Sequence, residues 1–221
     1  MKIPVFIFAK PPVPSEVKTR LIPALGAEGA AQLASAMLRD VWRAAQSHPG
    51  IHPILATTRP GGFSISVPDD DVWLQGEGDL GERIERIITR GLLHAPAAMA
   101  IGADSPAFSD AHLQAAIDCL ETHDAVVGPS MDGGFYLLAL RRCPRGLFGS
   151  LPWSTVETRQ ALEVRLEEHA FSVAELEPLF DGDIPVDLRT LAAYLDATSA
   201  LSATRAWWRE YSCESPSLFR L

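Results

Sequence analysis

Hydrophobic and polar residues follow two patterns along this chain, short apolar runs and longer stretches with a helical period. The apolar runs end at glycine, proline or charged residues, which is typical of buried strands. They lie at residues 3–9, 51–57, 72–75, 98–103, 125–128, 135–140 and 171–176. Between them, helical spacing predicts helices near residues 30–45, 80–92, 113–120, 155–169 and 186–195. This alternation of strands and helices predicts an α/β fold with a mostly parallel, doubly wound sheet.

The composition is that of an ordinary globular protein. The chain has 221 residues, of which 47% are hydrophobic and 21% are charged, and this length is sufficient for a large core. No repeat, low-complexity tract or linker divides it. We therefore expect residues 1–195 to form a single domain, with residues 196–221 as a helical tail that packs on the same domain.

The net charge and the cysteines limit the classes of binding partner and the cellular compartment that we expect for this protein. A formal net charge of −9 argues against a nucleic-acid partner, because phosphate backbones are bound by clustered lysine and arginine. The 3 cysteines lie far apart without a C-x-x-C pair, which fits neither a disulfide framework nor a zinc site. The apolar run at residues 3–9 lacks a signal-peptide cleavage pattern, and no apolar stretch reaches the length that a bilayer requires. We expect a cytoplasmic protein with no membrane span.

Two aspartates stand where apolar segments give way to glycine and proline. Asp104 lies within Gly102-Ala103-Asp104-Ser105-Pro106, and Asp183 lies within Asp181-Gly182-Asp183-Ile184-Pro185. Open α/β sheets bind ligands at the carboxyl ends of their strands, and Mg²⁺ binds through one or two carboxylates plus substrate phosphates. We expect Asp104 and Asp183 to share a cation, with Asp183 approaching from the last strand. The alternative for each aspartate is a turn residue.

The loop after the first strand carries positive charge that the chain as a whole lacks. Lys10, Lys18 and Arg20 fall within eleven residues of a proline-rich segment. Fixed cations at this place can hold a polyphosphate, although the loop has no Walker A glycines and could instead be a solvated connection.

The segment Gly76-Glu77-Gly78-Asp79-Leu80-Gly81 matches the G-x-G-x-x-G pattern of dinucleotide-binding proteins. Its two carboxylates disfavour this interpretation, because they would approach a pyrophosphate of like charge. Asp79 also suits the N-terminal cap of the helix that follows.

Several motifs together resemble those of one superfamily, the GT-A nucleotide-diphospho-sugar transferases. More narrowly, the chain looks like the small bacterial branch of arsenosugar-biosynthesis-type glycosyltransferases. The resemblance covers roughly residues 3–195 and rests on Phe8 to Pro14, Val17-Lys18-Thr19-Arg20-Leu21, Gly78 to Arg83, Gly102 to Pro106, Gly128-Pro129, Asp132 to Tyr136 and Pro152 to Thr155.

The resemblance implies a single-domain, Rossmann-like three-layer sandwich that binds a nucleotide and Mg²⁺ or Mn²⁺. It places Lys10, Lys18, Thr19, Arg20 and Asp79 at the nucleotide and its phosphates. Asp104 matches the metal-binding aspartate of the family, and Asp183 begins a stretch similar to the family's acidic ending.

The chain departs from the family pattern at three positions. Ile184 and Val186 replace a usual threonine and a usual acidic residue, which puts the second metal contact in doubt. Ser15 stands where glycine is usual and restricts access of the loop to positive φ.

We therefore expect a metal-dependent glycosyltransferase that uses a nucleotide-diphospho-sugar donor and a small-molecule acceptor. Asp132 precedes two glycines, which let the backbone approach a bound molecule, so it is the candidate general base, with a tight turn as the alternative. Guanylyltransferase-like nucleotidyl transfer from a nucleoside triphosphate stays open, because such enzymes share the fold and the basic loop. A nucleotide-binding module without turnover also stays open, and a homodimer is possible.

Overall fold

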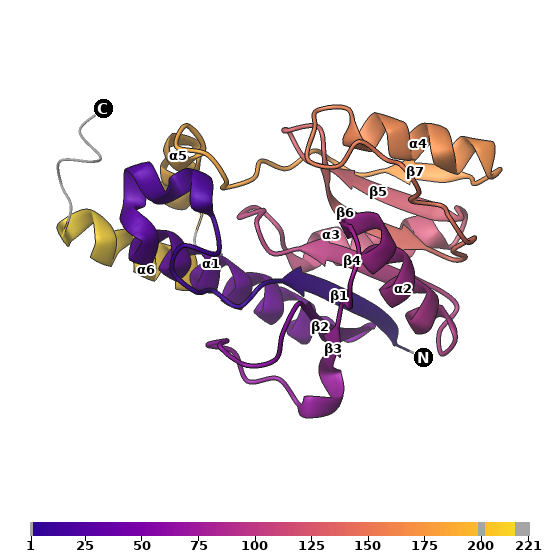
Figure 1. The fold of residues 1–221 in the computed structure, drawn as a ribbon, viewed down its shortest axis with the longest axis horizontal. Helices are drawn as coiled ribbons and strands as arrows, with labels where there is room; N and C mark the ends of the chain where they lie inside the picture. Colours follow the sequence, from indigo (N-terminus) through magenta and orange to yellow (C-terminus); the bar gives the residue numbers. More distant parts are fainter. Residues whose placement is uncertain (1, 199–201, 215–221) are drawn as a thin grey trace.

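The structure is a computed structural model that describes residues 2–198 and 202–214. Its centre is a seven-stranded sheet in the order β3-β2-β1-β4-β6-β5-β7 (Figure 1). The strands are β1 Ile3–Ala9, β2 Ile51–Thr57, β3 Val72–Leu74, β4 Ala98–Gly102, β5 Ala125–Pro129, β6 Phe135–Leu140 and β7 Val173–Glu175. All neighbouring strands are parallel except β6, which runs antiparallel to both β4 and β5. The α/β fold with a mostly parallel sheet is thus as the sequence predicts.

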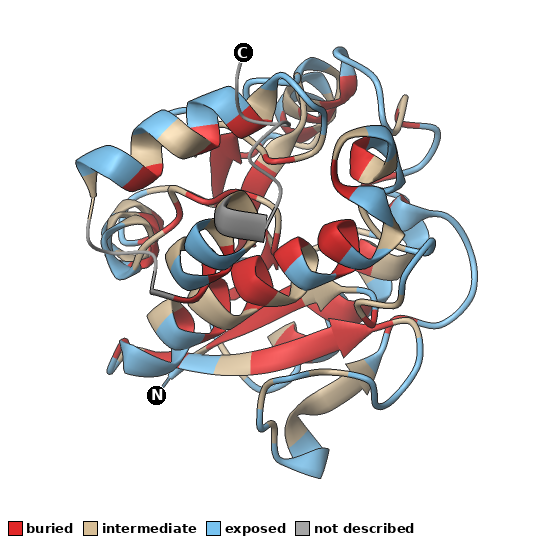
Figure 2. Ribbon diagram, turned by 90° about the vertical axis from the view of Figure 1, so that its left-hand side faces the viewer, coloured by how far each residue is buried: buried red, intermediate tan, exposed pale blue. Residues whose placement is uncertain are grey.

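Helices cover both faces of this sheet and make a three-layer sandwich. The helices are α1 Ile22–Ser47, α2 Leu80–Leu92, α3 Asp110–Leu120, α4 Thr158–Glu168, α5 Asp187–Ala197 and α6 Ser202–Glu214, with short 3-10 helices η1 Thr19–Leu21 and η2 Asp69–Asp71. Side chains of α1 and α3 pack in one core cluster, and those of α2 and α4 pack in another. Figure 2 shows the buried residues along the sheet and on the inner sides of the helices.

The first strand shows why the strands of this sheet are continuous apolar runs in the sequence. Val5 and Ile7 belong to the core under α1 and α3, whereas Phe6 points into the core under α2. Since alternate side chains point to opposite faces and both faces are covered, every position in the middle of the strand is apolar.

The longest helix, α1, begins at Ile22, ahead of the residue-30 region that the sequence predicts, because Pro23 suits the first turn of a helix. Gly26 has non-helical angles, φ 69° and ψ 166°, so a kink separates this first turn from the rest of α1. Together with η1, α1 spans Thr19–Ser47, 29 residues that contain an 18-residue window with a mean hydropathy of 1.2. By length and composition alone such a helix could cross a membrane, which the sequence analysis did not anticipate. Half of this apolar window is buried inside the protein. Packing in the core therefore accounts for its apolar character.

Helix α6 in the tail packs against α1. Tyr211 Oη donates a hydrogen bond of 2.6 Å to the Leu25 carbonyl, and a Cβ added at Gly29 would lie 2.7 Å from the Tyr211 ring. The Asp40 carboxylate accepts hydrogen bonds from the backbone N–H groups of Ala203 and Thr204, at 2.9 and 2.8 Å, and so caps the start of α6. Residues 215–221 of the expected tail lie outside the described residues, and the domain boundary at residue 195 stays a prediction.

Candidate functional site

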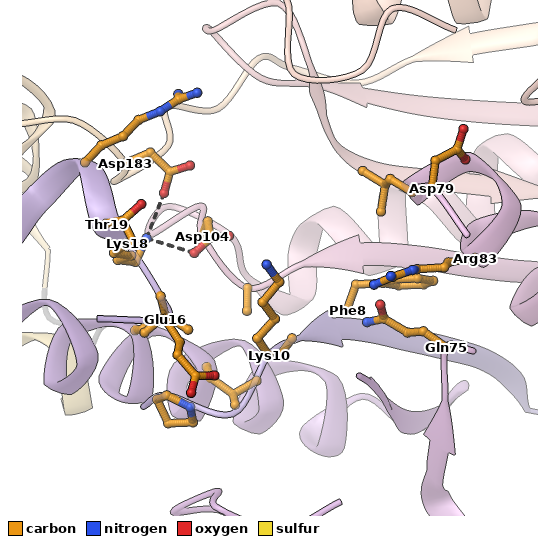
Figure 3. Close-up of a pocket in the computed structure, with 18 of the residues that line it drawn as sticks. Phe8, Lys10, Glu16, Lys18, Thr19, Gln75, Asp79, Arg83, Asp104 and Asp183 are labelled. Atoms are coloured by element: carbon orange, nitrogen blue, oxygen red, sulfur yellow. Dashed lines mark hydrogen bonds and ion pairs between the residues drawn. The ribbon is translucent and has the colours of Figure 1, made fainter. Parts of the chain in front are cut away.

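A cavity of about 610 Å³ opens at the carboxyl ends of β1 and β4 (Figure 3). The register pairs Phe8 of β1 with Gly102 of β4, so the loops that leave these two strands emerge side by side. Here the chain order of the strands reverses, from β1, β2 and β3 on one side to β4 on the other, which is where open α/β sheets bind ligands. Seven residues that the sequence singles out line this cavity: Lys10, Lys18, Thr19, Arg20, Asp79, Asp104 and Asp183.

The Lys18 ammonium joins the two predicted metal ligands. Its Nζ lies 2.8 Å from Asp104 Oδ1, 2.9 Å from Asp183 Oδ1 and 2.8 Å from the carbonyl oxygen of Gly182. Only 3% of the Lys18 side chain is exposed, and its three N–H donors all have acceptors. The ammonium is therefore directed at the carboxylates, and a direct contact with phosphate requires it to leave them.

Charge balance holds Lys18 in its ionised form. Burial alone would lower the pKa of its ammonium, but the carboxylates of Asp104 and Asp183 outweigh this effect and raise the pKa above its ordinary value. Burial raises the pKa of the Asp183 carboxyl, and Lys18 opposes that shift. Lys18 also has left-handed backbone angles, φ 43° and ψ 42°, which L-residues adopt at a cost.

Asp183 reaches the site from a loop and not from a strand end. The last strand ends at Glu175, and Leu179 adds only an isolated bridge to Ser130. The prediction that Asp183 approaches from the last strand is therefore wrong, because the apolar residues before it belong to a connection. The loop is fixed to the Asp104 turn by a hydrogen bond from Gly182 N to the Asp104 carbonyl of 3.0 Å.

Asp181, two residues earlier, is an acidic group at this site to which sequence reasoning gave no role. Ser105 Oγ donates a hydrogen bond of 2.5 Å to Asp181 Oδ1. Burial, with added repulsion from Asp132 and Asp183, raises the pKa of Asp181 to about 6, although hydrogen bonds from serine hydroxyls oppose the shift. The motif Asp181-Gly182-Asp183 could have indicated a pair of carboxylates at one turn.

Asp132 does not line the cavity. Its Oδ1 accepts hydrogen bonds from Ser130 Oγ at 2.5 Å and from the Gly134 N–H at 2.9 Å, so it closes a turn at the start of β6. Its charge nevertheless acts on the carboxyls of Asp181 and Asp183. The turn therefore places Asp132 beside the carboxylate cluster while one of its oxygens serves the turn.

The basic loop and the start of α2 border the cavity from opposite sides. In Figure 3 the Lys10 side chain points into it between the carboxylate end and the far end. Asp79 and Glu82 form a capping box, in which the Asp79 carboxylate accepts from Glu82 N and the Glu82 carboxylate accepts from Asp79 N, both at 2.9 Å. Ser15 has a φ of 69°, so this serine takes up the positive φ for which glycine is better suited.

Among the lining residues that were not predicted as ligands are Phe8, Gln75 and Arg83. Figure 3 places them at the end of the cavity away from Asp104 and Asp183. Gln75 directly precedes the glycine-rich segment, and Arg83 lies one turn into α2, so their positions beside that motif were the available signal.

The carboxylates of the site are few for a divalent cation bound by protein groups alone. Within residues 2–198 and 202–214, no group of three or more histidine, cysteine or acidic side chains is placed to hold a metal. Asp104 and Asp183 already hold one cation, the Lys18 ammonium, and they face a cavity that can admit phosphate oxygens. Two carboxylates with substrate phosphates suit Mg²⁺ or Mn²⁺, so the residues fit such an ion once Lys18 moves away.

Comparison with known families identifies the chain's relatives. Residues 43–155 match the family described as "Uncharacterized protein conserved in bacteria (DUF2064)". This chain belongs to that family. A comparison with curated proteins finds no match.

Solved structures share the fold of this DUF2064 protein. A candidate nucleotide-diphospho-sugar transferase from Desulfovibrio desulfuricans G20 is 25% identical, with a TM-score of 0.86 over 100% of this chain and 98% of that chain. A CMP:2-keto-3-deoxy-manno-octonic acid synthetase complexed with CTP is 14% identical, with a TM-score of 0.55 over 89% of this chain and 99% of that one. A cytidylyltransferase from Leptospira borgpetersenii serovar Hardjo-bovis is 15% identical, with a TM-score of 0.55 over 100% and 97%. The chain therefore has the fold of nucleotide-diphospho-sugar transferases, as the sequence predicts. Cytidylyltransferases share this fold.

Proposed function

We propose that this protein is a metal-dependent transferase that binds a nucleotide-diphospho-sugar and transfers its glycosyl group to a small-molecule acceptor. One observation carries the proposal. Asp104 and Asp183 converge on one positive charge, the Lys18 ammonium, at the edge of a cavity of about 610 Å³. The likeness to a candidate nucleotide-diphospho-sugar transferase supports it. Within this class we place the chain in the arsenosugar-biosynthesis-type branch, which its motifs resemble.

In this proposal the carboxylates of the cavity bind a metal ion, and its cationic side chains bind the diphosphate. Asp104 and Asp183 would hold Mg²⁺ or Mn²⁺, which supplies a positive charge that stabilises the diphosphate leaving group. Lys10 and Arg20 line the same cavity, and the Thr19 hydroxyl offers a neutral donor beside them. Charges fixed in advance stabilise the developing negative charge without reorganisation, which is usually a large part of catalysis.

Asp132 is the candidate general base, or the group that binds the acceptor hydroxyl. Its turn fixes one carboxylate oxygen by two hydrogen bonds, so the side chain has a defined direction. Its charge acts on the titration of Asp181 and Asp183. An acceptor bound at Asp132 would therefore lie near the carboxylates proposed to bind the metal. The carboxylate can then take the proton of an attacking hydroxyl.

Nucleotidyl transfer is the second candidate function. The same carboxylates and cations would act equally well on the α-phosphate of a nucleoside triphosphate, and a synthetase with this fold forms a complex with CTP. A binding module without turnover is the third, because Ile184 and Val186 depart from the family's acidic ending. A cytoplasmic location and a homodimer stay predictions from the sequence.

The products formed distinguish these candidates. The protein is incubated with Mn²⁺ and a panel of nucleotide sugars, and separately with nucleoside triphosphates, and the released diphosphates and pyrophosphate are quantified. Glycosyl transfer predicts nucleoside diphosphate from one or more sugar donors. Asp132→Asn should lower this release at least about tenfold, as expected for loss of a general base, while nucleotide affinity changes little.

Asp70→Asn is the matched control, because Asp70 is an exposed aspartate of η2 that does not line the cavity. This variant should leave product release unchanged. Pyrophosphate from a nucleoside triphosphate, without diphosphate from any sugar donor, would instead establish nucleotidyl transfer. Nucleotide binding without any product would establish the binding module.

A further inference from the structure

Gln75 holds a fixed hydrogen-bond acceptor in the wall of the cavity. The residue is only 5% exposed, and its Nε2 donates a hydrogen bond of 2.8 Å to the buried carbonyl of Ala56. Since a carbonyl oxygen can only accept, the amide NH₂ must face Ala56 and the amide oxygen must face the other way. Among the hydrogen bonds of residues 2–198 and 202–214, none donates to Gln75 Oε1. The amide oxygen of this cavity-lining residue is thus free to accept a hydrogen bond from a ligand.

Arg83 supplies donors at the same end of the cavity. Its Nε donates to the Gly78 carbonyl at 2.9 Å, which anchors the guanidinium to the glycine-rich segment. Its terminal nitrogens have no hydrogen-bond partner among residues 2–198 and 202–214. In Figure 3, Gln75, Arg83 and Phe8 lie together, whereas Asp104 and Asp183 occupy the opposite end. A nucleotide whose phosphates lie at the charged end would therefore present its base to Gln75 and Arg83.

We propose that Gln75 and Arg83 select nucleotides whose base carries a keto group, guanine, cytosine or uracil, over adenine. The inference rests on the proposed function, because it assumes a nucleotide in this cavity. Glutamine reads adenine best through both ends of its amide, but here the NH₂ end is held by Ala56. What remains is one acceptor for a base N–H and one guanidinium that donates to a carbonyl oxygen, as arginine does with O6 of guanine. Adenine has an N–H donor but no carbonyl, so it leaves Arg83 without its preferred acceptor.

The test compares four nucleoside diphosphates that differ only in the base. Dissociation constants of GDP, CDP, UDP and ADP are measured by calorimetry with the full chain. We expect at least one keto-base nucleotide to bind about tenfold or more tighter than ADP. In Gln75→Met the ratio of the ADP dissociation constant to that of the keto-base nucleotide should fall towards one. The affinity for ADP should stay within about twofold of the wild type, since only the base contact is lost.

Two further variants make the result decisive. Arg83→Met removes the donor from a more exposed position and should reduce the same preference, so it tests the proposal even where Gln75→Met fails to fold. Lys10→Met is the matched control, because Lys10 lines the cavity away from Gln75. This variant should weaken the binding of all four nucleotides by the same factor. Equal affinity for all four in the wild type, or a uniform loss in both variants, would overturn the base assignment and leave the proposed function standing. Absence of binding by every nucleotide would overturn both.

Discussion

At the scale of single residues, Lys18 is the most informative group in the site. Its ammonium occupies the point between Asp104 and Asp183 at which a shared metal ion would bind. A monovalent cation and a divalent cation cannot both take this point, so the protein without ligands carries its own counterion there. Removing one member of such a buried group leaves the remaining charges unpaired, which is costly.

We predict that Lys18→Met binds Mn²⁺ about tenfold or more tighter than the wild type in the absence of nucleotide. The methionine removes the competing ammonium and leaves two carboxylates that gain from a new cation. Electron paramagnetic resonance of free Mn²⁺ measures the affinity. Thermal unfolding provides a second readout, because a ligand that binds only the native state raises its stability.

Lys10→Met serves as the control here too, because Lys10 forms no ion pair with another described residue. It should leave the Mn²⁺ affinity of the free protein unchanged. If Mn²⁺ stabilises Lys18→Met no more than the wild type, Asp104 and Asp183 do not form the metal site.

At the scale of elements, the turn between β5 and β6 decides where Asp132 lies. Gly133 has a φ of +90°, and a Cβ added to it would lie 2.2 Å from the backbone oxygen of Val156. The backbone N–H of Arg159 donates a hydrogen bond of 2.9 Å to the Gly133 carbonyl. The turn is therefore packed directly on the segment that leads into α4, without space for a side chain.

Gly133→Ala should therefore destabilise the fold by about 3 kcal/mol or more, since it combines positive-φ strain of about 1–2 kcal/mol with a backbone clash. Gly146→Ala separates the two effects, because Gly146 has a φ of +79° but an added Cβ would meet nothing within 4 Å. It should cost only the strain. Urea denaturation measures both free energies of unfolding, and equal losses would show that contact with Val156 is unimportant.

At the scale of the whole molecule, folding brings together carboxylates that are far apart in the sequence. Asp181 is the member of this cluster whose ionisation the fold opposes most clearly, because burial raises its pKa to about 6 from an ordinary value of 3.8. The folded state binds more protons than the unfolded state between these two values. Its contribution to stability is therefore largest at low pH and is lost as the pH rises from about 4 to about 6.

Asp181→Asn should remove this contribution, because asparagine keeps an acceptor for Ser105 but does not titrate. The stability of the variant relative to the wild type should rise by about 2 kcal/mol between pH 4.5 and pH 7.5, which is the part of the shift, at about 1.36 kcal/mol per pKa unit, that lies within this range. Denaturant melts of both proteins across this pH range measure the difference, which cancels the shared titration of other groups. A difference that does not change with pH would show that Asp181 titrates normally.

Local patterns determined most of the elements of this protein. The bounds of β1, β2, β6 and α2 follow from apolar runs, helical spacing and glycine or proline punctuation, all of which act within a few residues. The cap at Asp79 is equally local, since it depends on Glu82 three residues later. The start of α1 and the origin of Asp183 differ from expectation because a proline at a helix start and an apolar connection carry weaker local signals.

Only the tertiary structure decided how the residues of the site meet. Lys18 and Asp183 are 165 residues apart, and their contact depends on the loop before α5 reaching the end of β1. The direction of β6, the burial of Asp181 and the orientation of Gln75 likewise depend on which strands pair and which loops cross the sheet edge. The sequence by itself therefore determined the α/β pattern and named most of the charged residues, because these are properties of short segments. The partner that each charge meets was decided by long-range packing, which no local pattern encodes.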